Sequence, residues 1–247
     1  MKTLITAIAA VSVLATSGLA GDRKFTYSYD VTTSPKGHWE YEQWITWKSY
    51  RSGTNKDRFD FRHELEIGLS DKLQLGIYLA DWTLTRQGGN TETEWKSSGA
   101  ELIYNLSNPT TDLLGSAIYG EVKLGEELFA LEAKLLLQKN IGPWTFIANT
   151  IVEAEWEGSD YEEEIGVFEQ TLGLSYDLSP SFSVGAEAKY ELEYERWSGS
   201  ADGALYVGPV ASYRKKDFFV AGTVLFQATD IDSEPDVQTR LIFGFHF

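Results

Sequence analysis

From residue 38 to the end of the chain, apolar and polar positions alternate with a period of two. The clearest stretch runs from Phe182 to Tyr194, where every second residue is apolar and the residues between are Ser, Gly, Glu or Lys. Successive side chains of a β-strand point to opposite sides, so this stretch predicts a strand with one apolar and one charged face. As a helix, the same residues would scatter their glutamates around the axis.

Stretches of this kind recur along the chain, separated by turn residues. The connections after even-numbered stretches are mostly tight, such as Ser179-Pro180, whereas several after odd-numbered ones are longer and polar, as at 86–94 and 157–165. Short turns on one side and long loops on the other are typical of bacterial outer-membrane barrels, with the short side periplasmic. The predicted strands are residues 38–50, 57–69, 73–85, 95–106, 114–124, 128–139, 144–156, 166–178, 181–194, 203–214, 218–229 and 236–247.

We therefore expect an all-β fold, a single transmembrane antiparallel up-and-down β-barrel of about twelve strands with both termini periplasmic. A soluble β-sandwich or a lipocalin-like barrel also alternates, but aromatic residues near the segment ends favour a membrane with two interfacial girdles. Trp144 to Trp156 would span about 30 Å at ~3.3 Å per residue and a tilt of roughly 40°. The girdle candidates are Trp39, Trp47, Trp144, Trp156, Phe182 and Tyr194.

The N-terminus has the pattern of a Sec signal peptide. Lys2 is followed by an apolar run and then by small residues at Gly18 and Ala20, which predicts cleavage before Gly21. The resulting organisation is a signal peptide at 1–20, a periplasmic segment at 21–37 and an outer-membrane β-barrel at 38–247. After residue 20 no apolar stretch approaches the eighteen or so residues that a membrane-spanning helix needs.

The charge balance narrows the function. The full chain carries a net charge of −16, and removal of Lys2 with the signal peptide makes it −17. Such an acidic chain argues against nucleic acid as a partner. The absence of cysteine excludes disulfides and thiolate metal sites, and nothing in the sequence indicates a cofactor.

The last predicted strand ends in a phenylalanine series, Phe243, Phe245 and Phe247. These residues resemble the signature that the barrel-assembly machinery reads in outer-membrane barrels generally. The resemblance implies two partners, this machinery and outer-membrane lipid.

Two segments between residues 32 and 76 resemble known families. The first contains Pro35-Lys36-Gly37, Trp39-Glu40 and Glu42-Gln43, and the second is the hairpin from Glu66 to Gly76. They resemble outer-membrane β-barrel transporters of the phenol meta-pathway type and a related uncharacterised barrel family. The resemblance implies a barrel that transports small solutes, including hydrophobic or aromatic ones.

The polar face of the strands predicts a charged lumen. Strand parity directs fourteen acidic and eight basic side chains inward, so the interior has an acidic excess. If water passes, that excess favours cations over anions. The lumen candidates are Glu40, Glu42, Arg58, Arg62, Glu64, Glu66, Glu121, Lys123, Glu132, Lys134, Glu153, Glu155, Glu187, Lys189, Glu191 and Arg240.

Several patterns could carry chemistry, but each has a simpler interpretation. Glutamates two residues apart, such as Glu64 and Glu66, could act as acid and base or hold a cation, although a charged lumen explains them better. The acidic stretch 157–164 is better explained as solvated loop than as a cation site. We expect no metal site.

The histidines argue against an enzyme. His38 and His246 are expected at the periplasmic end and His63 on the lipid face, so none is placed for general-base catalysis at the outer rim. His63 and Gln43 are polar residues on the otherwise apolar face of adjacent strands. We expect them to satisfy each other, or alternatively to pack against another protomer.

The sequence therefore predicts a passive channel for small solutes, with no catalytic residues. A closed barrel with a structural or surface-interaction role is the alternative, and a lipid-modifying hydrolase is the third hypothesis.

Overall fold

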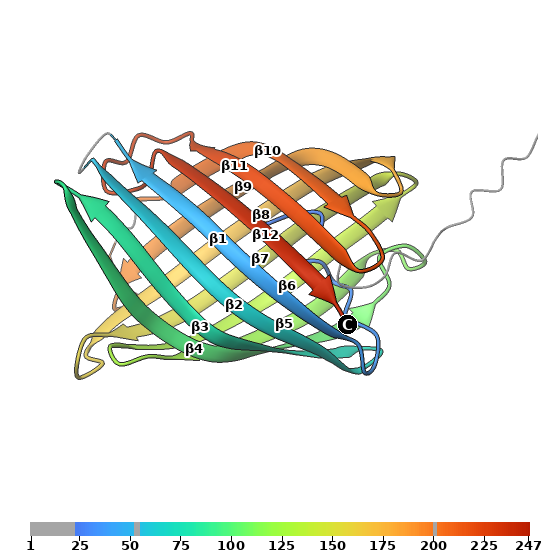
Figure 1. Cartoon of the computed structure of the whole chain (residues 1–247), viewed down its shortest axis with the longest axis horizontal. Helices are drawn as coiled ribbons and strands as arrows, with labels where there is room; N and C mark the ends of the chain where they lie inside the picture. Colours follow the sequence, from blue (N-terminus) through green and yellow to red (C-terminus); the bar gives the residue numbers. More distant parts are fainter. Residues whose placement is uncertain (1–22, 52–54, 200–201) are drawn as a thin grey trace, which may run out of the picture.

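The computed structural model describes residues 23–51, 55–199 and 202–247, and the predicted signal peptide lies outside them. Within them, twelve antiparallel strands form a closed barrel in which each strand pairs with the next and β1 pairs with β12 (Figure 1). No helix among these residues is long and apolar enough to cross a membrane. The strands are β1 (Trp39–Tyr50), β2 (Lys56–Ser70), β3 (Leu73–Gln87), β4 (Asn90–Ser107), β5 (Gly115–Leu124), β6 (Leu128–Ile141), β7 (Trp144–Glu157), β8 (Glu163–Ser179), β9 (Phe182–Glu195), β10 (Ala204–Arg214), β11 (Phe218–Gln227) and β12 (Val237–His246).

The predicted fold class and strand number are confirmed, and one connection differs clearly. The stretch 86–94 is not a loop, because β3 continues to Gln87 and β4 begins at Asn90. Gly88 and Gly89 join the two strands with φ values of +58° and +86°. A two-residue hairpin turn with two positive φ angles suits glycine, which has no Cβ to clash.

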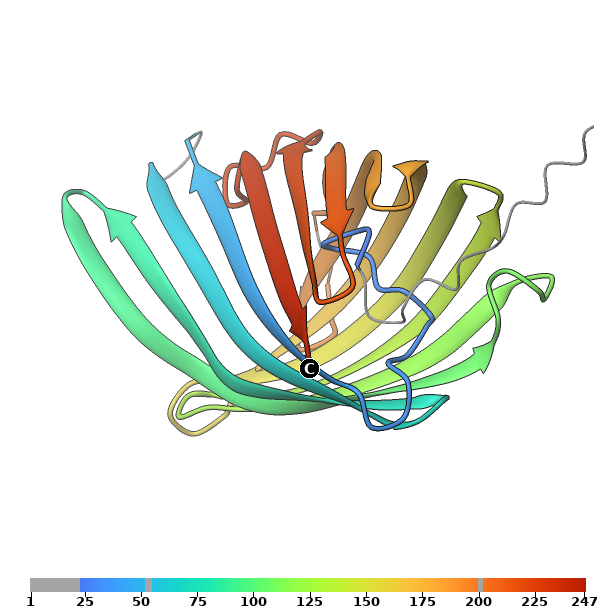
Figure 2. The ribbon, with the colours of Figure 1, turned by 45° about the vertical axis from the view of Figure 1, so that its right-hand side comes forward.

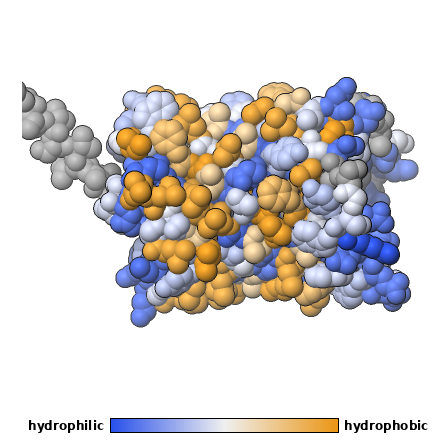
Figure 3. Space-filling view, turned by 180° about the vertical axis from the view of Figure 1, so that it is seen from behind, coloured by the Kyte–Doolittle hydropathy of each residue, from blue (hydrophilic) through white to orange (hydrophobic). Residues whose placement is uncertain are grey.

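The barrel wall separates apolar from polar side chains as the alternation predicts. Outward residues such as Leu135, Leu172 and Phe245 are exposed, and Figure 3 shows an apolar band round the middle with hydrophilic ends. Inward residues such as Glu64 and Glu187 are buried. A sheet closed on itself has no free edge, so the backbone N–H and C=O groups of every strand can pair with neighbouring strands and need no water.

The main departure from expectation is the N-terminal segment. Residues 21–37 are expected as a periplasmic segment, but from residue 23 the chain runs through the barrel interior, as the blue trace in Figure 2 shows. Phe25, Tyr27, Tyr29 and Val31 are all buried against inward side chains of the wall. We call residues 23–34 the N-terminal plug.

Irregular pairing changes which side chains of β3 and β4 face inward. His63 pairs with Ala80 and Glu64 with Tyr78, so Leu79 is an extra residue relative to β2. Such a β-bulge shifts the alternation by one position. A second irregularity in the β3–β4 pairing leaves Lys96 as an extra residue.

Candidate functional site

The plug is held by side chains of the wall that accept its backbone N–H groups. The Glu187 carboxylate on β9 accepts from Thr26 (3.1 Å), Tyr27 (3.0 Å) and Ser28 (2.8 Å), and also from the Thr223 hydroxyl (2.6 Å). Buried backbone donors need partners, and the plug forms no strand that could supply them. The Glu187 carboxylate therefore supplies the acceptors that a neighbouring strand would provide in a β-sheet.

Amides on other strands continue this pattern along the plug. Asn149 accepts from the Tyr29 backbone N–H (2.6 Å) and donates to its carbonyl (3.1 Å). Gln138 accepts from Val31 (3.0 Å), and Gln74 accepts from Ser34 (2.7 Å). The partners come from β3, β6 and β7, so the plug crosses the lumen and contacts several parts of its wall.

Ion pairs and aromatic contacts secure the first plug residues. Arg23 Nε lies 2.7 Å from Glu42 Oε1, and its Nη2 lies 3.3 Å from Glu66 Oε1. The same guanidinium lies 4.7 Å from the ring centres of Tyr29 and Trp44, within the range of cation–π attraction. The position of Arg23 is therefore determined by both charge and stacking.

Asp30 is partly buried where the plug passes the wall. Burial raises the pKa of its carboxyl to about 6, against the opposing effect of the positive charges of Lys24, Arg23 and Arg214. Asp30 belongs to the plug and to no membrane-crossing strand.

The plug separates two cavities. On the side away from the C-terminus lies a cavity of about 510 Å³, which we call the vestibule, with Tyr27 and Tyr29 of the plug in its lining. On the other side is a cavity of about 30 Å³, and Tyr29 lines it too. The plug thus lies between a large polar chamber and a small pocket near the chain termini.

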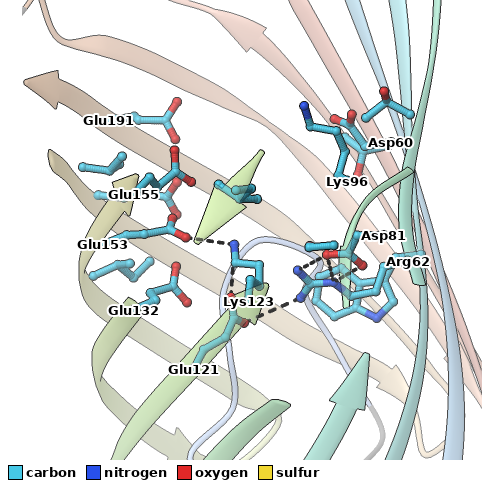
Figure 4. Close-up of a pocket in the computed structure, with 18 of the residues that line it drawn as sticks. Asp60, Arg62, Asp81, Lys96, Glu121, Lys123, Glu132, Glu153, Glu155 and Glu191 are labelled. Carbon is cyan, nitrogen blue, oxygen red and sulfur yellow. Dashed lines mark hydrogen bonds and ion pairs between the residues drawn. The ribbon is translucent and has the colours of Figure 1, made fainter. Parts of the chain in front are cut away.

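The vestibule has charged walls of opposite character. β7–β9 contribute six glutamates and a single lysine, Lys189. β1–β4, across the barrel, contribute four basic residues, Lys48, Arg58, Arg62 and Lys96, and two acidic ones, Asp60 and Asp81. Figure 4 shows carboxylates such as Glu153 and Glu155 facing Arg62 and Lys96. The six glutamates, which we call the acidic wall, are Glu153, Glu155, Glu157, Glu169, Glu191 and Glu193.

A chain of ion pairs connects the two walls at the base of the vestibule. Arg62 lies 2.9 Å from Asp81 and 3.8 Å from Glu121. Lys123 then bridges Glu121 (3.1 Å) and Glu153 (2.8 Å), as the dashed lines in Figure 4 show. The pairing compensates most charges at this level, while Glu155 and Glu193 higher in the acidic wall have no ion pair among the described residues.

The structure places all sixteen predicted lumen residues on the inner face of the wall, in two groups. Five lie outside the vestibule lining, namely Glu40, Glu42, Glu64, Glu66 and Glu187. The vestibule group is Arg58, Arg62, Glu121, Lys123, Glu132, Lys134, Glu153, Glu155, Lys189, Glu191 and Arg240.

Sequence reasoning missed several charged residues of the interior, including Arg23 and Lys24 of the plug and Asp81 and Lys96 of the wall. Arg23 and Lys24 were missed because residues 21–37 were expected outside the barrel, although their ion pairs lie inside it. Asp81 and Lys96 were missed because the bulges shift their parity, and only backbone pairing reveals a bulge at Leu79.

The predicted girdle residues lie in two sets along the strands. Trp39, Trp144 and Phe182 begin β1, β7 and β9 at the end where the C-terminus lies. The other three, Trp47, Trp156 and Tyr194, lie toward the opposite strand ends. Of the terminal series, Phe245 and Phe247 are exposed, and Phe243 packs edge-on against Phe245 at 6.1 Å.

Gln43 and His63 are direct partners across β1 and β2, as expected, but they do not bond to each other. Trp82 Nε1 donates to His63 Nε2 (3.3 Å), which leaves Nδ1 as the donor to the Tyr41 hydroxyl (2.9 Å). Tyr41 donates to Gln43 Oε1 (3.1 Å), and Gln43 donates to the Arg62 carbonyl (2.8 Å). Because of this chain of hydrogen bonds, each of these polar groups has a partner although it lies on the apolar outer face. We call the chain the outer relay.

The histidines do not gather with a nucleophile. His38 is exposed beside the start of β1, and His63 belongs to the outer relay. His246 Nδ1 lies 3.2 Å from Glu40 Oε2 inside the barrel. These three positions match those that the strand pattern predicts.

Comparisons with solved structures show the same fold. An outer-membrane channel from Pseudomonas putida F1 is 13% identical, with 90% of this chain and 100% of that chain covered and a TM-score of 0.60. The NanC porin is 9% identical, with 84% and 98% covered and a TM-score of 0.55. The translocator domain of the autotransporter NalP from Neisseria meningitidis is 11% identical, with 85% and 88% covered and a TM-score of 0.53.

No curated protein has a sequence that matches this one. The model of a family of unknown function, DUF6662, matches residues 17–234. Because that match covers most of the chain, this β-barrel belongs to the DUF6662 family.

Proposed function

We propose that this chain is a passive outer-membrane channel for small solutes, with the vestibule as its entrance and no enzymatic role. The observation that supports this best is a closed barrel with an apolar exterior that encloses a charged chamber of about 510 Å³. A chamber of that size holds small solutes. The similarity in fold to a channel from Pseudomonas putida F1 and to the NanC porin supports the same class of function.

In this proposal both termini and the plug are on the periplasmic side, the vestibule opens to the cell exterior, and the signal peptide directs secretion. Four of the five connections at the end of the barrel that carries the C-terminus have two or three residues. At the other end β3–β4 and β5–β6 are also tight, whereas β7–β8, β9–β10 and β11–β12 are longer. Outer-membrane barrels place their short turns in the periplasm. Outer-membrane lipid and the barrel-assembly machinery are the proposed partners, with Phe243, Phe245 and Phe247 as the assembly signal.

The proposed selectivity is for cations. The vestibule lining contains ten acidic and eight basic side chains, and the acidic wall includes glutamates without an ion pair among the described residues. A low-dielectric chamber with an excess of one charge concentrates the opposite ion. Glu155, Glu157 and Glu193, which line the vestibule without an ion pair among the described residues, would attract cations as they enter.

Planar bilayer recordings under a KCl gradient test this proposal. We expect a reversal potential of cation-selective sign, reduced in the triple variant Glu155→Gln, Glu157→Gln, Glu193→Gln. Glu126→Gln, outside the vestibule, serves as the matched control. An anion-selective reversal potential, or equal selectivity in the triple variant, contradicts the proposal.

Deletion of residues 23–34 tests whether ions pass through the lumen. Without the plug the two cavities become continuous, so we expect conductance several-fold above that of the intact chain. A variant that folds and shows unchanged conductance would place the ion path outside the lumen.

The plug also favours the alternative of a closed barrel with a structural or surface-interaction role. Its side chains occupy the lumen between the two cavities. Absence of conductance from both the intact and the plug-deleted barrel supports this alternative. The third hypothesis, a lipid-modifying hydrolase, has no comparable support, because no histidine lies in the vestibule lining.

A further inference from the structure

Below the plug, three carboxylates converge on one point of the inner wall. Glu42 on β1 and Glu64 and Glu66 on β2 each offer an oxygen, and these atoms all lie within 4.8 Å of one another. Calcium binds oxygens at about 2.3–2.6 Å, so two oxygens on one ion are at most ~5 Å apart. The three glutamates thus have the spacing of ligands around a single cation.

Glu64 differs from its neighbours because it lacks a partner. Glu42 accepts from Arg23 and from Trp44 Nε1, and Glu66 accepts from Arg23 and Gln74. Glu64 is 0% exposed, and neither of its oxygens has a hydrogen-bond partner among the residues that the structure describes. A buried carboxylate left without any partner costs several kcal/mol. The structure therefore leaves a place for a positively charged ligand at Glu64.

The wall is shaped to admit this carboxylate. A Cβ at position 76 would lie 2.6 Å from Glu64 Oε1 and 2.6 Å from Glu101 Cγ. Gly76 therefore makes room for both glutamates over β3. The small cavity of about 30 Å³, which Glu42, Glu66 and Arg23 line, adds space for one or two waters.

Charge favours a divalent ion. Three carboxylates and the guanidinium of Arg23 leave two negative charges, which one divalent cation neutralises. Calcium accepts irregular sets of oxygen ligands, whereas magnesium retains several waters in a strict octahedron. The small cavity suits the first ion better than the second.

We propose that Glu42, Glu64 and Glu66 bind a divalent cation of the calcium type beside Arg23, at the base of the N-terminal plug. The ion would share Glu42 and Glu66 with Arg23, and so would link the plug to the wall. The site is independent of whether the barrel conducts.

Terbium luminescence gives a direct readout, because Tb³⁺ replaces Ca²⁺ and is sensitised by a nearby indole. Trp44 Nε1 lies 2.6 Å from Glu42 Oε2. With the full mature chain folded in detergent and stripped with EDTA, excitation of tryptophan should give saturable Tb³⁺ emission. We expect Ca²⁺ to displace Tb³⁺ at concentrations at least tenfold below those that Mg²⁺ requires.

Two variants locate the site. Glu64→Gln removes the unpartnered charge, and we expect it to abolish both the emission and the rise in melting temperature with Ca²⁺. Gly76→Ala keeps all three glutamates but displaces Glu64, and we expect at least a tenfold loss of affinity. Glu126→Gln, an exposed glutamate in the turn between β5 and β6, should leave both responses unchanged.

Either of two results would overturn the proposed metal site. Absence of saturable emission from the intact chain contradicts metal binding at Glu64. Emission that persists in both Glu64→Gln and Gly76→Ala places the metal elsewhere. Folding of each variant is checked by the faster migration of unheated barrels in gels, so a loss of binding is distinguishable from a loss of structure.

Discussion

Glu187 shows how one side chain organises a segment that has no regular structure. Its two oxygens accept from three consecutive backbone N–H groups of the plug and from a threonine hydroxyl. Charge-assisted hydrogen bonds of this kind are roughly twice as strong as neutral ones. A buried N–H that loses its acceptor retains the full cost of its desolvation.

We expect Glu187→Ala to lower the free energy of unfolding by about 3 kcal/mol or more, because several buried donors lose their acceptor at about 1–3 kcal/mol each. Denaturant titration of the barrel folded in lipid vesicles measures this change. Glu193→Ala, on the same face of β9 but without a plug contact, should cost less than about 1 kcal/mol. Equal losses in the two variants would show that Glu187 does not hold the plug.

Asp30 gives the plug a pH dependence. Its folded pKa of about 6 lies above the ordinary value of 3.8, chiefly because of burial among the wall residues. A raised carboxyl pKa means that the folded state holds the proton more tightly than the unfolded state. The stability from Asp30 is therefore complete below about pH 4 and is lost as the pH rises through about 6.

Thermal unfolding of the intact chain and of Asp30→Asn between pH 4 and pH 7 tests this dependence. We expect the melting temperature of the intact chain to fall relative to the variant across that window. The difference arises because only the intact chain must release a proton. Parallel curves for the two proteins, or a gap that opens in the opposite direction, would refute the role of Asp30.

Strand β3 shows how one extra residue changes the chemistry of a whole hairpin. Beyond the bulge at Leu79, Asp81 faces the lumen and bonds Arg62, while Trp82 faces outward and stacks on Phe61 at 4.0 Å. Continued strict alternation would put the carboxylate of Asp81 into lipid. A charged group there costs about 2.5–3.5 kcal/mol at the membrane centre.

We expect deletion of Leu79 to prevent stable folding, because every residue of β3 after the bulge then points to the opposite face. The gel mobility of unheated and heated samples measures the folded fraction. Leu79→Ala keeps the extra residue and should fold like the intact chain. A folded deletion variant with full yield would show that the bulge is not needed to orient Asp81.

The barrel and its plug form one folded unit, since the buried aromatic cluster of the lumen contains residues of both. Tyr29 packs against Trp44 at 6.0 Å and Tyr119 at 5.4 Å, across strands that are distant in sequence. The lumen is therefore filled by the chain itself on the side of the termini and open to solvent on the other. Any solute path must pass the plug.

Limited trypsin digestion should detect whether the plug stays docked. We expect no cleavage after Arg23 or Lys24 in the folded chain, because both are held by ion pairs inside the barrel. The exposed Arg51 at the opposite end serves as the internal control. Glu187→Ala should allow cleavage near the plug, detected by mass spectrometry, whereas rapid cleavage there in the intact chain would contradict stable docking.

The sequence alone determined the twelve strands, their inner and outer faces except beyond the bulges of β3 and β4, and the charged character of the lumen. These features follow from local geometry, since neighbouring side chains of a strand must point to opposite sides of the wall. The sixteen predicted inner residues followed from that parity alone, and so did the outward position of His63. Each strand by itself shows the division into an apolar outer face and a polar inner face.

Only the tertiary structure decided where the N-terminal segment lies and which glutamates meet. Apolar and polar residues alternate from Phe25 to Val31, but this pattern does not show that the segment lies in the lumen. Its partners Gln74, Asn149 and Glu187 are separated from it by many residues. The convergence of Glu42, Glu64 and Glu66 depends on the register of β1 against β2, in which Glu42 is the direct partner of Glu64. Contacts across the lumen arise from closure, and no local rule of alternation encodes them.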